Sequence, residues 1–476
     1  MENNLFEEFK PNTKAQWIEQ ATNDLKGKDF NQVLVSETLD GIKIQPFYTA
    51  EDANGFHRLK AYQNSFHPAP EIPGLSPRLW SNVFFVNGMP PKEGNKLILD
   101  ALMNGCDALY VEVSEKTDFE SLLKDVEIQY LGIYLCPSSG INPLDTLNNF
   151  LDWLKNKGVN KNALNGGFLW DGVSSLLREG GILKDNVSIV KSLLENLSDF
   201  PNFSALSINF SVYHEAGGSA LEELKYAFSA YIELLDHLTE TGVEPESIFK
   251  NTMLHFSVGS RYFEEISKIR TARIFFDALA ALYAVHLNQV EVKVFCQSSN
   301  WTKSRLDVYT NMLRNTSEGM AAILGGCNAL WIRPHDEVTG MTTAFSQRMA
   351  RNISNILKEE TYLDKVMDPV AGSYFVESLT SKMLEKLKSE LQEIEAMGGW
   401  RKIYEDQSLQ LKVKTRRKQR QEAVLSGDVV KIGANKFRQD KEALSFNVSE
   451  AIHEAAWQLL PARETELLEE KARKSS

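Results

Sequence analysis

The chain has 476 residues, of which 43% are hydrophobic and 24% are charged, which is the composition of a folded globular protein and excludes a disordered or fibrous one. Its net charge of -12 argues against nucleic acid as a partner, because phosphate binding requires a concentrated basic surface. No apolar run is long enough to cross a bilayer, and the four cysteines form no CxxC pair. We therefore expect a cytoplasmic protein with free thiols and no membrane partner.

Residues 1–62 predict an N-terminal arm made of a helix and a hairpin. The helix has apolar residues at helical spacing over residues 17–25. Asp40 and Gly41 lie between two runs of alternating apolar residues, which is a hairpin signal. An element of this size buries little surface by itself, so it is expected to pack on another domain or chain. Residues 63–79 contain four prolines and predict a linker.

Strand-like and helix-like stretches alternate eight times over residues 80–360. Strands are expected at residues 80–86, 108–113, 129–135, 167–170, 205–211, 253–258, 290–295 and 329–332. The helical patterns between and after them include residues 96–103, 144–154, 221–238, 264–287, 308–324 and 342–358. Eight β-α units in a segment of this length favour an α/β fold of the (β/α)8 TIM-barrel class, with a doubly wound open sheet as the alternative.

Residues 361–476 predict a C-terminal loop and a helical extension. Helices are expected at residues 381–397, 400–420 and 449–474, with a short strand and loop at residues 428–437. The extension contains a basic run, KVKTRRKQR, at residues 412–420. We interpret this run as the solvated face of a helix, because charge runs usually lie on the surface.

The stretch FSALSINFSVYHEAGG at residues 203–218 predicts a barrel strand that leads into the face where barrel enzymes place their chemistry. In strand alternation, four side chains share one polar face: Ser207, Asn209, Ser211 and Tyr213. Tyr213, His214 and Glu215 then form a cluster at the strand end. A histidine there can serve as an acid or a base near neutral pH, and a purely structural histidine is the alternative.

Two further polar runs follow strands near the end of the predicted barrel. The run at residues 297–300 has amide and hydroxyl groups that can hold a carbonyl or a phosphate. Three residues share a strand face with Gln297: Glu291, Lys293 and Phe295. If that face points inward, bulky groups fill the barrel. The alternative is that the same face points outward, toward the surrounding helices. The second run consists of His335, Asp336 and Glu337 and is either a metal site or a helix cap. The cap is favoured because adjacent residues rarely point at one ion.

Several long stretches resemble the adenosylcobalamin-dependent acyl-CoA mutases, and specifically methylmalonyl-CoA mutase. They are FSVGSRYFEEISKIRTARIFF, CQSSNWTKSRLDVYTNMLRNTSEGMAA, DEVTGMTTAFSQRMARNISNILKEE and DPVAGSYFVESLT, together with the opening WIEQATNDLKGKDFNQVLVSETLDGIKIQPFYTAED. The resemblance covers nearly the whole chain. It implies a (β/α)8 barrel through which the coenzyme A chain threads, and a separate cobalamin domain that caps the barrel.

The positions that carry catalysis in the family are changed in this chain. Catalytic members have an SGYHMQEAG-like segment whose Tyr and His contact the substrate, and these positions are Ser211 and Val212 here, so that Tyr213 and His214 fall two residues later. A THCQTSGW-like segment has an imidazole where this chain has Phe295, and phenylalanine cannot donate a hydrogen bond to a thioester carbonyl. The resemblance thus implies no catalytic residue, and the remaining candidates are Tyr213, His214 and Gln297.

Two other family segments are missing. The arginine-, tyrosine- and glycine-containing segment before the barrel is absent between Glu51 and Trp80, and no histidine lies in an Asp-x-His-x-x-Gly cobalt-ligand signature. We therefore expect no cofactor and no metal in this chain. Adenosylcobalamin would be bound by a partner chain, because the radical chemistry belongs to the cofactor.

Together these features imply the small, non-catalytic subunit of a heterodimeric methylmalonyl-CoA mutase. Its large catalytic subunit would hold adenosylcobalamin, and residues 5–48 would wrap on that partner. The pair would interconvert methylmalonyl-CoA and succinyl-CoA by a radical carbon-skeleton rearrangement. One alternative is a catalytic barrel whose cobalamin domain is a separate chain, and another is a non-enzymatic binding module on the same fold. Binding of a CoA thioester by this barrel stays open.

Overall fold

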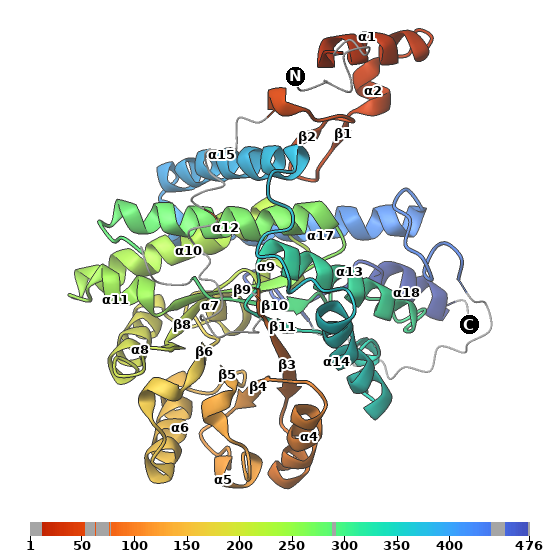
Figure 1. The fold of residues 1–476 in the computed structure, drawn as a ribbon. Coiled ribbons are helices and arrows are strands. Elements are labelled where there is room, and N and C mark those ends of the chain that lie inside the picture. The colour runs from red at the N-terminus through yellow and green to blue at the C-terminus, as the bar shows by residue number, and fades with distance from the viewer. Residues whose placement is uncertain are drawn as a thin grey trace, which may run out of the picture.

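The computed structural model describes residues 12–52, 62, 76, 78–287, 292–438 and 453–474, and its centre is a closed parallel barrel (Figure 1). The barrel strands are β3 (Ser81–Val86), β4 (Ala108–Val113), β5 (Gly132–Pro137), β6 (Asn165–Phe168), β7 (Phe203–Ser204), β8 (Leu206–Asn209), β9 (Thr252–Val258), β10 (Val294–Ser298) and β11 (Ala329–Trp331). They are joined in parallel in the order β7-β6-β5-β4-β3-β11-β10-β9-β8. Only Ala205 separates β7 from β8, so both edges of the sheet belong to one strand and the barrel closes. This confirms the (β/α)8 TIM-barrel prediction.

Helices surround the barrel and follow its strands in sequence (Figure 1). They are α4 (Pro91–Met103), α5 (Phe119–Leu122), α6 (Pro143–Lys157), α7 (Ser174–Glu179), α8 (Leu183–Asn196), α9 (Ser211–Glu215), α10 (Ala220–Glu240), α11 (Pro245–Lys250), α12 (Tyr262–Leu282), α13 (Thr310–Gly325) and α14 (Ala344–Glu359). Local sequence sets their ends. Ser219 and Glu222 form a reciprocal capping box at the start of α10, and Gly158 takes the left-handed conformation that ends α6.

The fifth strand ends earlier than predicted, which corrects the expected polar face at Ser211 and Tyr213. Phe210 has helical backbone angles, φ -70° and ψ -27°, and α9 begins at the next residue. The His214 N–H donates to the Phe210 carbonyl at 3.3 Å, so a helical turn, and not a neighbouring strand, satisfies the backbone here. Side chains beyond Asn209 therefore no longer alternate between the two faces of the barrel wall.

Other boundaries also differ from the predictions. The seventh strand, expected at residues 290–295, lies at Val294–Ser298, and residues 290–291 lie outside the described residues. The helix expected at residues 264–287 ends at Leu282 as α12. The first part of the expected linker, residues 63–75, also lies outside the described residues.

The N-terminal arm lies on one side of the barrel. It consists of α1 (Lys14–Asp24), α2 (Phe30–Leu34), β1 (Ser36–Glu37) and β2 (Lys43–Ile44), and the two strands pair antiparallel as the hairpin signal predicts. Figure 1 shows α1 and α2 beyond α15, separated from the barrel. Neither α1 nor α2 contains a buried residue. The hairpin turn, in contrast, is anchored, since Asp40 accepts from the Leu221 N–H at 3.1 Å.

The C-terminal extension corrects two predictions. It contains α15 (Tyr374–Ala396), α16 (Gly399–Glu405), α17 (Ser408–Ser426) and α18 (Glu466–Lys474), but residues 453–465 are not helical, because Pro461 cannot supply a helical N–H and keeps the preceding residue extended. Residues 428–437 make a turn with a single bridge between Ile432 and Lys436 instead of a strand. The basic run in α17 is only partly solvated, because Arg417 and Arg420 pair with Glu454 and Glu464.

Candidate functional site

Aromatic side chains fill the axis of the barrel. The ring of Tyr110 lies 4.8 Å from that of Phe85, 5.3 Å from Phe295 and 5.4 Å from Trp331, measured between centroids. Tyr134 lies 4.9 Å from Phe295. We call these five residues the aromatic plug. Phe295 therefore points inward, as one of the two interpretations of its strand face predicted, and the axis is packed like a protein core.

A hydroxyl and amide network lies at the carboxyl ends of the strands. The Gln297 amide nitrogen donates to the hydroxyls of Ser211 and Ser257, each at 2.9 Å, and these two hydroxyls lie 2.8 Å apart. Ser257 also donates to the Glu215 carboxylate at 2.6 Å. The structure thus brings two predicted positions, Ser211 and Gln297, into one buried network. The Gln297 amide nitrogen and the Ser211 hydroxyl are therefore already bound within the protein.

Glu215 is the fixed negative charge of this network. Its carboxylate accepts from the backbone N–H groups of Asn300 at 3.1 Å and Trp301 at 3.0 Å. Burial alone would raise its pKa, but the positive charge of Arg333 and these hydrogen bonds hold the pKa below its usual value. Glu215 is therefore an ionised carboxylate that ties α9 to the loop after β10.

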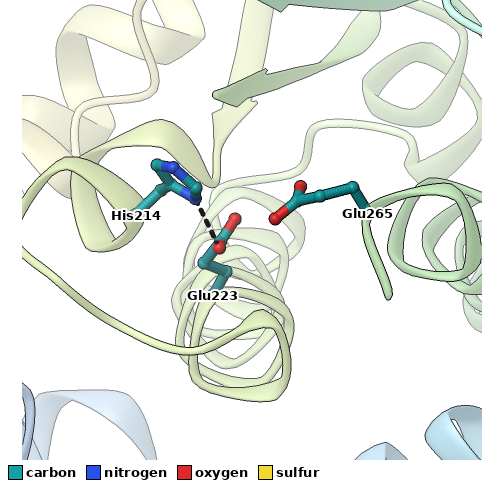
Figure 2. A group of neighbouring side chains, drawn as sticks. All are labelled: His214, Glu223 and Glu265. Carbon is teal, nitrogen blue, oxygen red and sulfur yellow. Dashed lines mark hydrogen bonds and ion pairs between the residues drawn. The ribbon is translucent and has the colours of Figure 1, made fainter. Parts of the chain in front are cut away.

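His214 belongs to a buried ion-pair cluster outside the aromatic plug (Figure 2). Its Nδ1 lies 2.7 Å from the Glu223 carboxylate, and its Nε2 lies 2.8 Å from the Ser299 hydroxyl. Burial would lower the pKa of His214, but the Glu223 carboxylate raises it above the usual value. Both ring nitrogens have protein partners, so the imidazole is held in a structural role in this conformation.

His214, Glu223 and Glu265 place three metal-ligand atoms close together, as Figure 2 shows. The ammonium of Lys268 already supplies the positive charge between the carboxylates. It lies 2.6 Å from Glu223 and 2.6 Å from Glu265, and its side chain is fully buried. Burial would lower the pKa of Lys268, but the two carboxylates raise it, so the lysine stays charged. This cluster is chemically satisfied as a salt bridge without an ion.

Tyr213 and Val212 lie away from the barrel axis. The Tyr213 hydroxyl accepts from the Trp400 indole N–H at 3.2 Å and donates to the Tyr226 carbonyl at 3.4 Å. These partners belong to α16 and α10, so the tyrosine ring packs between the barrel and its helical coat. Val212 is buried in the main apolar core. The two-residue shift therefore changes both the identity and the surroundings of the side chains at this strand end.

An arginine over the aromatic plug was missed by reasoning from sequence. The Arg333 guanidinium lies 4.3 Å from the centre of the Trp331 ring and pairs with Glu337 at 2.7 Å. Burial raises the pKa of Tyr110, and the charge of Arg333 opposes that rise. The only sequence signal for Arg333 is its position just after a strand. On α7, among the described residues, the Arg178 Nε has no hydrogen-bond partner.

The polar run after β11 does not converge on one point. His335 stacks near Tyr309, with ring centres 5.6 Å apart, and Glu337 pairs with Arg333. The Asp336 carboxylate accepts from the Thr343 hydroxyl at 3.0 Å, just before α14. Three adjacent residues with three separate partners fit the capping interpretation better than a metal site.

Within the part of the chain that the structure describes, no helix has the length and apolarity needed to span a membrane. A family model described as methylmalonyl-CoA mutase matches residues 111–474. The chain is 31% identical, over 91% of its length, to the methylmalonyl-CoA mutase small subunit of Porphyromonas gingivalis and covers 71% of that protein.

Longer proteins match at lower identity. The chain is 28% identical to the methylmalonyl-CoA mutase of Cereibacter sphaeroides and 25% identical to the mitochondrial methylmalonyl-CoA mutase of Homo sapiens, in each case over 90% of its own length. It spans 64% and 61% of these two relatives, which is less than two thirds of either.

Proposed function

The chain belongs to the methylmalonyl-CoA mutase family, and from that premise we propose that it is the small, structural subunit of a two-chain methylmalonyl-CoA mutase. The large subunit carries out the interconversion of methylmalonyl-CoA and succinyl-CoA in this proposal. The name of the Porphyromonas gingivalis relative supports the subunit assignment. The four free cysteines agree with a reducing, cytoplasmic setting.

The observation that carries the proposal is the aromatic plug. A chain that threads coenzyme A through its barrel needs an open axis, whereas here the ring centres of Phe85, Trp331, Tyr110 and Phe295 lie 4.6 to 5.4 Å from their neighbours. Displacing such a layer would expose several rings and open a cavity in a packed core. We therefore propose that this barrel admits no pantetheine chain and serves as a scaffold.

In this proposal adenosylcobalamin is held by the large subunit. Two of the described barrel histidines are not placed to ligate cobalt: His214 is bound on both nitrogens, and His255 lies inside the barrel against Phe295, with ring centres 5.2 Å apart. Burial lowers the pKa of His255 to about 3, which keeps it neutral. Among the described residues the Nδ1 of His335 has no hydrogen-bond partner, but its ring packs against those of Tyr309 and Phe345. No reaction step is assigned to these residues.

The N-terminal arm is the surface we assign to the partner. Val33 and Phe47 are 49% and 39% exposed, and Trp17 lies against Phe47 with ring centres 4.9 Å apart. Two helices without a buried residue are stabilised little by packing on their own chain. Their apolar side chains would be buried by another protein surface. A permanent heterodimer that includes this arm would bury more than about 2,000 Å².

The test is an assay of methylmalonyl-CoA isomerisation with excess adenosylcobalamin, performed with the purified chain alone, with the large subunit alone and with both. We expect no turnover by this chain alone, and a higher rate or a higher melting temperature of the large subunit after mixing. Turnover by the chain alone would overturn the subunit assignment and return Tyr213, His214 and Gln297 to the list of catalytic candidates.

One observation favours the alternative of a binding module. Among the described residues the Nε of Arg178, on α7, has no hydrogen-bond partner, and a guanidinium suits a carboxylate or phosphate. Titration of the chain with methylmalonyl-CoA, followed by calorimetry, separates the two functions. The scaffold function predicts no micromolar binding, whereas micromolar binding to the isolated chain, without any effect on the large subunit, would establish a binding module.

A further inference from the structure

The barrel wall is open between its first and last strands. Among the described residues, β3 and β11 pair at two positions, Ser81 with Ala329 and Asn82 with Leu330. Beyond these positions β3 pairs with β4, and Trp331 of β11 pairs with β10. The two strands therefore part over the carboxyl half of the barrel, on the side where α14 packs beside β3 (Figure 1).

The slot between these strands holds a cavity of about 90 Å³, which we call the wall cavity. Phe85 and Trp331 form its inner side, and their ring centres lie 4.6 Å apart, so the aromatic plug separates it from the barrel axis. Its other lining residues include Ala350 and Arg351 of α14 and Met89, which precedes α4. A space of this size can hold one small organic molecule, since a single water needs only about 10–15 Å³.

Two side chains of the wall cavity carry buried polar atoms of opposite kind that have no partner. Among the described residues, the Nε of Arg351, a donor, and the Oε2 of Glu337, an acceptor, make no hydrogen bond. The Nη1 of Arg351 lies 3.3 Å from the Asp100 carboxylate, and the Oε1 of Glu337 lies 2.7 Å from Arg333. Because an unsatisfied buried donor or acceptor is costly, a molecule that offers one acceptor and one donor would stabilise this site.

The charges around the wall cavity balance one another. Arg351 pairs with Asp100 and Arg333 pairs with Glu337, so two cations face two carboxylates. Cys106 adds no charge, because burial raises the pKa of its thiol to about 12. A ligand with a net charge would leave that charge uncompensated in a partly buried site, whereas a zwitterion would not.

We propose that the wall cavity binds a free α-amino acid with a short apolar side chain. The carboxylate of the ligand accepts from the Arg351 Nε, its ammonium donates to the Glu337 carboxylate, and its alkyl group packs on the Trp331 ring. The volume limits the alkyl group to a few carbons, because an apolar cavity of about 150 Å³ accepts no more than a benzene-sized molecule. This site goes beyond the proposed function and does not rest on it, since all its residues belong to this chain.

The proposal is tested by titrating the full chain with L-α-aminobutyrate and following its isotope-labelled methionine methyl groups by NMR. Met89 lines the wall cavity, whereas Met103 is 84% exposed on α4 and serves as the internal reference. The Met89 signal is identified by its loss in Met89→Leu. We expect the amino acid to shift the Met89 signal in a saturable way and to leave that of Met103 unchanged. No saturable shift of Met89 would overturn the proposal.

Two analogues of the ligand test its two charged contacts separately. Butyrate lacks the ammonium and propylamine lacks the carboxylate, and each keeps the alkyl chain of L-α-aminobutyrate. We expect each analogue to bind at least tenfold more weakly than the amino acid. Equal affinity for either analogue would overturn the proposal, because the contact that the analogue lacks would then contribute nothing to binding.

A pair of leucine substitutions on α14 tests the location of the site. Ala350→Leu places extra volume in the wall cavity, and Ala344→Leu places the same side chain at an exposed position of the same helix. Affinity for L-α-aminobutyrate should fall at least tenfold in the first variant and stay unchanged in the second. Equal affinities would overturn the proposal. If Ala350→Leu does not fold, Arg351→Gln makes the same comparison with Arg348→Gln, since Arg348 is exposed on α14 and the charge change is the same.

Discussion

At the scale of single residues, the buried charge of Lys268 holds two carboxylates together. We predict that Lys268→Met destabilises the protein by about 3–5 kcal/mol, because Glu223 and Glu265 lose their counter-charge in a buried site. Urea unfolding at pH 7 measures the loss. Lys412→Met, at an exposed position of α17, should change stability by less than about 0.5 kcal/mol. Equal stabilities of the two variants would show that the cluster is neutralised in another way.

Glu464 gives the stability of the protein a pH dependence of known sign. Burial would raise its pKa, but Lys431 and Arg420 lower it to about 2, against 4.5 for a free side chain. A carboxyl whose folded pKa is depressed stabilises the fold above its unfolded pKa and loses that contribution as the pH falls toward the folded value. We expect a loss on the order of 3 kcal/mol between about pH 4.5 and 2.

The check is the urea midpoint of the wild type and of Glu464→Gln, followed from pH 6 down to pH 2.5. The glutamine cannot titrate, so the variant should be less stable at pH 6 and should approach the wild type at low pH. Parallel pH curves for the two proteins would contradict the assignment of the titrating group.

At the scale of elements, the aromatic plug ties opposite walls of the barrel together. Phe295 on β10 contacts Tyr110 on β4 and Tyr134 on β5. We predict that Phe295→Ala costs about 3–5 kcal/mol, because the neighbouring rings hold the cavity open. Phe263→Ala on α12, where the ring is 46% exposed, is the control and should cost much less. Equal melting temperatures for the two variants would show that the plug carries little of the stability.

Element types in this chain are predictable from sequence, whereas the paths of side chains near element ends are not. Alternation over residues 205–211 correctly indicates a strand, yet the same alternation extends to Tyr213 and gives the wrong face, because a short helix satisfies the backbone from Ser211 onward. The long helix expected at residues 449–474 fails for a related reason. Pro461 interrupts it, and backbone contacts with the barrel rim, distant in sequence, hold residues 453–465 in a non-helical path before α18.

In the candidate site, too, the strands are predictable from sequence, whereas the side-chain neighbours are not. Strand parity in the sequence groups Phe295 with Gln297 on one face, but only the contacts with Tyr110 and Tyr134 show that this face points inward. Arg333 carries no local motif, and its place over the Trp331 ring is visible only in three dimensions.

At the scale of the whole molecule, the arm and the barrel have different roles. We predict that a variant starting at residue 36, which lacks α1 and α2, keeps the barrel folded, since neither helix contains a buried residue. Circular dichroism should show a melting temperature within a few degrees of the full chain. Its affinity for the large subunit should fall by at least tenfold in analytical ultracentrifugation. Undiminished affinity would assign the interface to another surface.

The closed axis also changes how this chain responds to metabolites. A ligand stabilises a fold only to the extent that it binds the folded state. Because the plug leaves no passage, we predict that saturating methylmalonyl-CoA leaves the melting temperature of this chain unchanged, whereas that of the large subunit rises. Calorimetry of each chain, with and without the thioester, makes the comparison. A thermal shift in this chain would contradict a sealed axis.

In the proposed two-chain enzyme this lack of response would have a consequence. A subunit whose stability does not vary with substrate would offer its partner the same surface with and without substrate. The arm is then anchored, through the bond from the Leu221 N–H of α10 to Asp40, to a barrel whose stability does not depend on substrate. The rings that close the axis would thereby make the conformation of one barrel of the pair independent of acyl-CoA. The other barrel could then open and close against a fixed neighbour.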